Sequence, residues 1–133
     1  MNGVTATQDD YLKHSNRAKP YISSNKTIKQ IPDSNFWHVM GPPSCLAASV
    51  KDLSKWLMLQ LGLIKQDVVS TESLSKIQRP VDKNISLYAM GWWQADDEGL
   101  VCCHTGGVTG FESVIVMIPS LQTGMVISCN LSG

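Results

Sequence analysis

The chain has 133 residues, of which 43% are hydrophobic, and its eleven Lys and Arg residues balance its eleven Asp and Glu residues. A chain of this length can form one ordinary domain with a real core. Its zero net charge argues against nucleic acid as a partner, and no apolar run approaches the ~18 residues that a membrane span needs. The first residues have no basic start followed by an apolar stretch, so we expect neither an export signal nor an anchor, and the localisation stays open.

The four cysteines, Cys45, Cys102, Cys103 and Cys129, are too few and too unevenly spaced for a disulfide scaffold. We expect them to be reduced. Cys102, Cys103 and His104 could suggest a metal site, but neighbouring residues of a strand point to opposite faces and no second ligand pair is present. The sequence therefore predicts no metal and no cofactor.

Residues 1 to about 45 are polar and interrupted by four prolines. This composition predicts a long irregular segment, mostly extended loop, with short helical turns possible. Its two histidines, His14 and His38, have no acidic partner at a readable spacing, which favours solvent exposure or packing over catalysis.

Two helices are predicted next. Ser49 can cap a helix over residues 50–61, in which apolar residues recur at helical spacing. Ser70 or Thr71 can cap a second, short helix over residues 71–78, and Pro80 ends it.

After the second helix the apolar period changes to that of strands. Segments 87–94, 100–105, 112–119 and 124–130 are short, rich in Val, Ile and aromatic residues, and separated by turn signals. They predict an antiparallel meander of three to four strands, and hence an α+β fold. Since neighbouring strand residues face opposite ways, we expect Trp92 rather than Trp93 in the core.

A polar triplet, His104-Thr105-Gly106, followed by Gly107, stands between two apolar strands. One interpretation is a simple hairpin loop over residues 106–110, with His104 as a satisfied edge residue. The other is one wall of a catalytic site, in which glycine leaves a backbone N–H free to stabilise an oxyanion. The spacing of the triplet alone favours the hairpin loop.

The wider string, YAMGWWQADDEGLVCCHTGGVTGFESVIVMIPSLQTGMVISCNLSG, resembles the closing segment of the serine β-lactamase and penicillin-binding-protein-like family, in particular its class C β-lactamase-related branch. There a Tyr-Gly-x-Gly-Trp-like strand precedes a His-Thr-Gly or Lys-Thr-Gly strand, then Gly-Phe and two further strands. GPPSCLAASVKDLSKWL and NRAKPY resemble segments upstream of it. The resemblance implies that residues 1–133 form a single partial domain, the C-terminal portion of a β-lactamase/transpeptidase-like fold.

Two elements of the family's site are missing from the matched segments. The family nucleophile is the Ser of a Ser-x-x-Lys motif, which works with a Tyr-x-Asn or Ser-x-Asn motif. The strings that begin at Ser23 and Ser73 have the first spacing but not the family position, and no tyrosine is followed two residues later by Asn. We therefore expect no catalytic nucleophile in this chain.

By resemblance, His104, Thr105 and Gly106 form the substrate-binding strand, and the Gly107 amide matches the strand donor of the oxyanion hole. The implied function is that of a C-terminal fragment of a serine hydrolase, inactive alone, whose complete form acts on a small acyl substrate. Two alternatives remain open: a non-catalytic ligand-binding or complementation module, and a small esterase that uses a stray serine. As partners we expect either the missing N-terminal portion or a second copy in a dimer, because consecutive apolar residues in segment 113–118 suit a strand buried on both faces.

Overall fold

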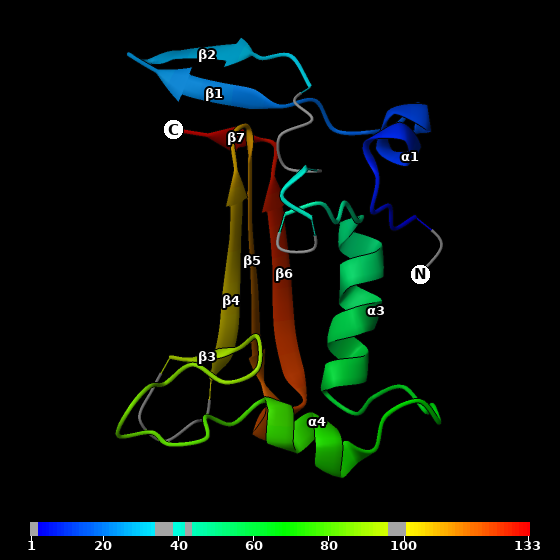
Figure 1. Ribbon diagram of the computed structural model, residues 1–133, viewed down its shortest axis with the longest axis vertical. Coiled ribbons are helices and arrows are strands. Elements are labelled where there is room, and N and C mark those ends of the chain that lie inside the picture. The colour runs from blue at the N-terminus through cyan, green and yellow to red at the C-terminus, as the bar shows by residue number, and fades with distance from the viewer. Residues whose placement is uncertain (1–2, 34–38, 42–43, 96–100) are drawn as a thin grey trace. The chain divides into compact units, whose positions relative to one another are not determined.

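The computed structural model describes residues 3–33, 39–41, 44–95 and 101–133. They form an α+β fold with two sheets, which confirms the predicted fold class (Figure 1). The chain divides into two compact units, the first made of residues 1–53, 106–113 and 127–133, the second of residues 54–105 and 114–126.

The larger sheet is the predicted meander. Its strand order is β3-β4-β5-β6, with β3 at Trp93–Gln94, β4 at Cys102–Val108, β5 at Phe111–Ile118 and β6 at Thr123–Cys129. Only two residues, Thr109 and Gly110, separate β4 from β5. Gly110 has a φ of +90°, and a Cβ there would collide with the Pro20 side chain, so glycine is required both by the turn and by the close approach.

Both predicted helices are present, as α3 at Val50–Gln60 and α4 at Thr71–Ile77. The caps are those read from the sequence. The Ser49 hydroxyl accepts the Asp52 backbone N–H at 3.1 Å, and the Ser70 hydroxyl accepts that of Ser73 at 3.1 Å. Each cap satisfies a backbone donor that the first helical turn leaves without a partner.

The second unit has a hydrophobic core to which α3 and the strands of the meander contribute. Trp92 is 2% exposed and Met117 is completely buried, whereas Trp93 is 49% exposed. The prediction that Trp92 is the inward member of the pair is therefore confirmed. Trp92 also stacks on Trp56 of α3, with ring centroids 5.4 Å apart. The buried cluster comprises Leu57, Ala89, Trp92, Cys102 and Met117.

Three buried glutamine side chains link α3, α4 and β3 within the same unit. The Gln78 amide donates to the Gln60 backbone carbonyl at 2.9 Å, and the Gln94 amide donates to the Gln78 backbone carbonyl at 3.3 Å. Buried polar groups are costly unless they are paired, so this chain of amides fixes the mutual arrangement of the three elements.

The first unit contains more regular structure than the irregular segment predicted for it. Helix α1 at Gln8–Lys13 is capped by Thr7 and carries a Lys13–Asp10 ion pair of 3.0 Å. A hairpin follows, with β1 at Tyr21–Ser24 antiparallel to β2 at Thr27–Gln30. Its turn residues, Asn25 and Lys26, both have positive φ, as the tight turns of two-residue hairpins require.

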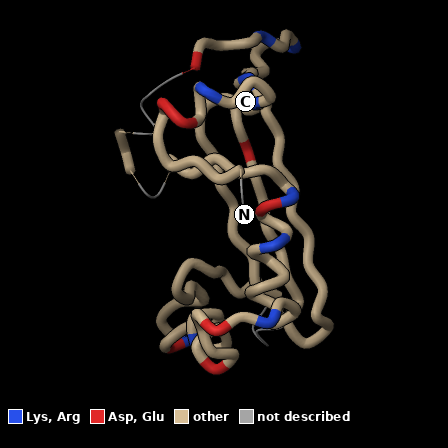
Figure 2. Tube along the Cα trace, turned by 90° about the vertical axis from the view of Figure 1, so that its right-hand side faces the viewer, with Lys and Arg blue, Asp and Glu red and all other residues tan. Residues whose placement is uncertain are grey.

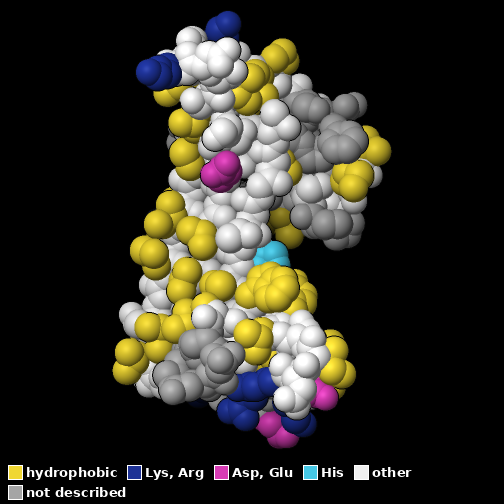
Figure 3. Space-filling view, turned by 90° about the vertical axis from the view of Figure 1, so that its left-hand side faces the viewer, with side chains coloured by type: hydrophobic (Ala, Val, Ile, Leu, Met, Phe, Trp, Pro, Cys, Tyr) yellow, Lys and Arg dark blue, Asp and Glu magenta, His cyan; other side chains and the backbone are white. Residues whose placement is uncertain are grey.

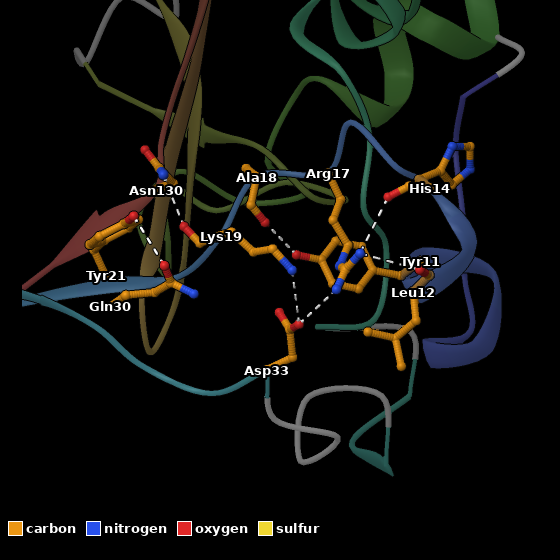
Figure 4. Close-up of polar contacts among 10 residues, drawn as sticks. All are labelled: Tyr11, Leu12, His14, Arg17, Ala18, Lys19, Tyr21, Gln30, Asp33 and Asn130. Carbon is orange, nitrogen blue, oxygen red and sulfur yellow. Dashed lines mark hydrogen bonds and ion pairs between the residues drawn. The ribbon is translucent and has the colours of Figure 1, made fainter.

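Strand β1 also pairs in parallel with β7, Leu131–Ser132, which completes a second sheet of order β2-β1-β7. No parallel pairing was predicted for this chain. Polar contacts hold the entry to β1 in place (Figure 4). The Asn130 side chain donates to the Lys19 backbone carbonyl at 2.9 Å, and both Arg17 and Lys19 form ion pairs with Asp33, at 3.2 and 3.7 Å.

Tyr11 supports the same segment from α1. Its hydroxyl donates to the Ala18 carbonyl at 2.7 Å, and the Arg17 guanidinium lies over its ring at 5.7 Å from the centroid (Figure 4). Burial raises the pKa of Tyr11, and the negative charge of Asp33 raises it further.

Charged residues of both signs are distributed along the described trace, as expected of a chain with zero net charge (Figure 2). No helix in the described part of the chain combines the length and the hydropathy needed to cross a bilayer.

Candidate functional site

His104 lies inside β4 rather than at its end. The predicted strand stopped at residue 105, but β4 continues through Gly106 and Gly107 to Val108. The interpretation of residues 106–110 as a hairpin loop is therefore wrong, because the turn contains only residues 109 and 110. His104 is half-buried, as the third residue of a seven-residue strand.

The residues before β3 fold back on themselves instead of forming one long strand over residues 87–94. The Ala89 amide donates to the Trp92 carbonyl at 2.7 Å, and Gly91 has a φ of +86°. This tight turn pairs Tyr88 with Trp93 in an antiparallel bridge. As a result Tyr88 lies next to β4, where it meets His104.

Both ring nitrogens of His104 have partners. Nδ1 lies 2.7 Å from the backbone carbonyl oxygen of Thr105, and Nε2 lies 3.1 Å from the hydroxyl oxygen of Tyr88. The Tyr88 ring also packs against Trp93, edge to face, with centroids 4.7 Å apart. Tyr88, Trp93 and His104 thus form an aromatic and imidazole cluster, which we call the Tyr88 cluster, within the second unit.

Beside this cluster the described strands leave part of one edge of β4 unpaired. Strand β3 pairs only with Cys102 and Cys103, so in the part of the chain that the structure describes no strand pairs with β4 beyond Cys103 on that side. Backbone N–H and C=O groups on a free edge can pair with an extended ligand.

The two glycines of the motif differ in their surroundings. A Cβ on Gly106 would lie 2.6 Å from the Ser113 hydroxyl oxygen, whose own hydrogen bond to the Gly106 carbonyl is 3.4 Å. Glycine at 106 therefore allows β4 and β5 to pair closely. A Cβ on Gly107 would meet no atom within 4 Å, so the space beside Gly107 is open.

The two serines with Ser-x-x-Lys spacing lie in a hairpin strand and in a helix cap. Ser23 is an exposed residue of β1, and Lys26 lies in the hairpin turn. Ser73 belongs to the cap of α4, where the Ser70 hydroxyl donates to it at 2.9 Å, and Lys76 pairs with Glu72 at 2.8 Å. In the described structure neither lysine is hydrogen-bonded to its serine, and both pairs are exposed to solvent.

Two shallow hollows of the described surface have linings that do not include His104. One is lined by Ile22, Ser24, Asn25, Thr27 and Lys29 of the hairpin; the other lies over the loop between α3 and α4. Among the described residues no three His, Cys, Asp or Glu side chains converge in a way that could hold a metal ion. None of the four cysteines, all of which the structure describes, forms a disulfide. His14 is exposed at the end of α1, and His38 lies outside the described residues.

Comparison with known proteins relates the whole chain to part of longer ones. "Protein flp" of Staphylococcus aureus strain NCTC 8325 is 33% identical over 140 residues, and that of strain MW2 is 29% identical over 140 residues. Each alignment covers 99% of this chain and 26% of the relative, so the chain spans about a quarter of the length of these curated relatives. No model of a protein family matches the chain.

One solved structure has a fold similar to that of this chain. The octameric penicillin-binding protein homologue from Pyrococcus abyssi superimposes with a TM-score of 0.73 at 21% sequence identity, over 98% of this chain and 30% of that one. The chain has a fold of the penicillin-binding-protein and β-lactamase-like type.

Proposed function

We propose that this chain supplies the His-Thr-Gly strand, one wall of the active site, of a serine hydrolase related to the class C β-lactamases, and that it is inactive alone. The complete enzyme acts on a small acyl compound: a β-lactam, a D-amino-acid peptide or an ester. The fold supports this proposal, and so does the position of His104 on an open strand edge beside Tyr88.

Within this proposal each residue of the motif has a role. His104 faces the substrate, Thr105 packs behind it, Gly106 lets the strand pair closely with β5, and the N–H of Gly107 stabilises the oxyanion. One such donor in a complete site contributes ~3 kcal/mol to the transition state. The nucleophile comes from the portion of the enzyme that these 133 residues do not represent, since Ser23 and Ser73 lack an activating base.

Covalent labelling tests the proposal. The purified chain, treated with a fluorescent penicillin or a fluorophosphonate, should gain no mass. A chimera in which this chain replaces the matched quarter of Protein flp should be labelled like that parent protein. In the chimera His104→Ala should slow labelling, because it removes the side chain that faces the substrate, whereas His14→Ala, at an exposed helix end, should have no effect. An adduct on Ser23 or Ser73 of the isolated chain would favour the small esterase instead.

We also propose that the chain associates with copies of itself. The structural neighbour is an octamer, and large apolar side chains are exposed on several elements of this chain. On β6, Met125 is 52% and Ile127 49% exposed. Figure 3 shows one face, on which hydrophobic side chains reach the surface at several places. A large exposed apolar area is typical of interfaces, and a two-fold dimer is the simplest way to bury it.

A further inference from the structure

We propose that Tyr88 is a positioning residue for His104, which holds its imidazole in one orientation with the proton on Nδ1. The observation behind this is the set of two hydrogen bonds that engage both ring nitrogens at once. The inference refines the site described under the proposed function, but its evidence is the geometry of the Tyr88 cluster alone.

The direction of each hydrogen bond follows from the chemistry of the partners. A backbone carbonyl can only accept, so the 2.7 Å contact with the Thr105 oxygen requires a proton on Nδ1. In the neutral imidazole Nε2 is then the acceptor, and the Tyr88 hydroxyl, 3.1 Å away, donates to it. The Thr105 carbonyl, which can only accept, thus selects the tautomer, and the Tyr88 hydroxyl donates to the ring nitrogen that is left without a proton.

The Tyr88 hydroxyl is itself held by the backbone and by a neighbouring ring. The tight turn over residues 89–92 pairs Tyr88 with Trp93, and the two rings meet edge to face at 4.7 Å. An edge-to-face pair is favoured by the charge distribution of the rings and restricts their rotation. The hydroxyl is therefore directed at His104 before any ligand arrives.

This arrangement changes what a ligand meets. Neutral His104 has no free N–H to offer, since its single ring proton is already donated to Thr105. A ligand at the open edge of β4 encounters the Tyr88 hydroxyl and the imidazole as a bonded pair. Tyr88, 39% exposed, is thus placed to act on a substrate through His104.

Side-chain ¹⁵N NMR of the full chain measures the tautomer directly. It is recorded at a pH well above about 6.5, the ordinary pKa of a histidine side chain. His104 should be mainly in the Nδ1–H form. Tyr88→Phe keeps the ring against Trp93 but removes the donor, which should shift the tautomer ratio toward Nε2–H by about fivefold, the effect of one net hydrogen bond. Tyr21→Phe, whose hydroxyl bonds Gln30, is the matched control and should leave His104 unchanged.

Three results would overturn the inference: a wild-type His104 that is mainly Nε2–H, a ratio unchanged in a folded Tyr88→Phe variant, or an equal shift in Tyr21→Phe. The backbone amide spectrum verifies that each variant is folded, and the wild-type tautomer needs no variant. Because the measurement requires no hydrolysis, its failure is distinguishable from failure of the proposed function, which the labelling experiment reports separately.

Discussion

Replacing Trp92 with alanine should destabilise the chain far more than the same change at its neighbour Trp93. Trp92 is 2% exposed in the core of the second unit and stacks on Trp56 at 5.4 Å. Removal of a buried tryptophan costs about 3–5 kcal/mol, and loss of an aromatic pair adds about 0.5–1.5 kcal/mol. Since domains have only about 5–15 kcal/mol of stability, this is a large share.

Trp93 is the matched control because it has the same side chain one position along. It is 49% exposed, and its ring packs edge to face with that of Tyr88. Trp93→Ala should therefore cost only about 0.5–1.5 kcal/mol for the aromatic pair, plus part of the burial of one ring. The two variants should differ by about 2 kcal/mol.

Urea unfolding followed by far-ultraviolet circular dichroism measures both variants without relying on tryptophan fluorescence. With a slope of about 1–3 kcal/mol per molar urea, the difference corresponds to a shift in midpoint of roughly 1 M. Trp92→Phe, which keeps a ring beside Trp56, should fall between wild type and Trp92→Ala. Equal destabilisation by Trp92→Ala and Trp93→Ala would refute the assignment of the two residues to opposite faces.

Three further predictions follow from other parts of the structure. Gly110→Ala should lower the urea midpoint by the equivalent of about 1–3 kcal/mol, because the φ of Gly110 is +90° and a Cβ would meet Pro20. Gly107→Ala, where a Cβ would meet open space, should change stability little, and similar losses in the two variants would contradict this account. Thiol titration of the unfolded chain should count four free cysteines, because β5 lies between the strands of Cys103 and Cys129 and separates them by ~10 Å; a count of two would argue against the strand order. Analytical ultracentrifugation at micromolar concentration should show species larger than the 14.6 kDa monomer; a pure monomer that binds no dye for apolar surface would disprove self-association.

Local signals predicted the elements whose causes are local. Ser49 and Ser70 predict the two helices, because a hydroxyl at the N-cap position accepts a hydrogen bond from a backbone N–H within the next three residues. The meander was predictable because its strands are neighbours in sequence and are joined by short turns. The hairpin at Tyr21–Gln30 was missed because its turn is Asn25-Lys26, and only the asparagine is a residue that readily adopts positive φ.

The candidate site was only half predictable. His104 could be found from its position between two apolar strands and from the resemblance of the surrounding string. Tyr88 could not, because residues 87–94 have the composition of one continuous strand, in which Tyr88 and Trp93 would lie far apart. The available signal was Gly91, which allows the turn that brings the two together, but glycine inside an apolar run does not by itself specify a reversal.

The parallel pairing of β1 with β7 has a consequence for biosynthesis. Tyr21 pairs with Leu131, and the Asn130 side chain bonds the carbonyl of Lys19, a separation of 111 residues. A ribosome adds about 5–20 residues per second and shields the newest part of the chain. The β1–β2 hairpin is therefore synthesised several seconds before β7, its third strand, is available for pairing. Contacts between such distant residues also form slowly after release, because a long loop must close first. During that interval the free edge of β1 is open to strands of other nascent chains, and a chaperone that covers extended segments would raise the yield of folded protein.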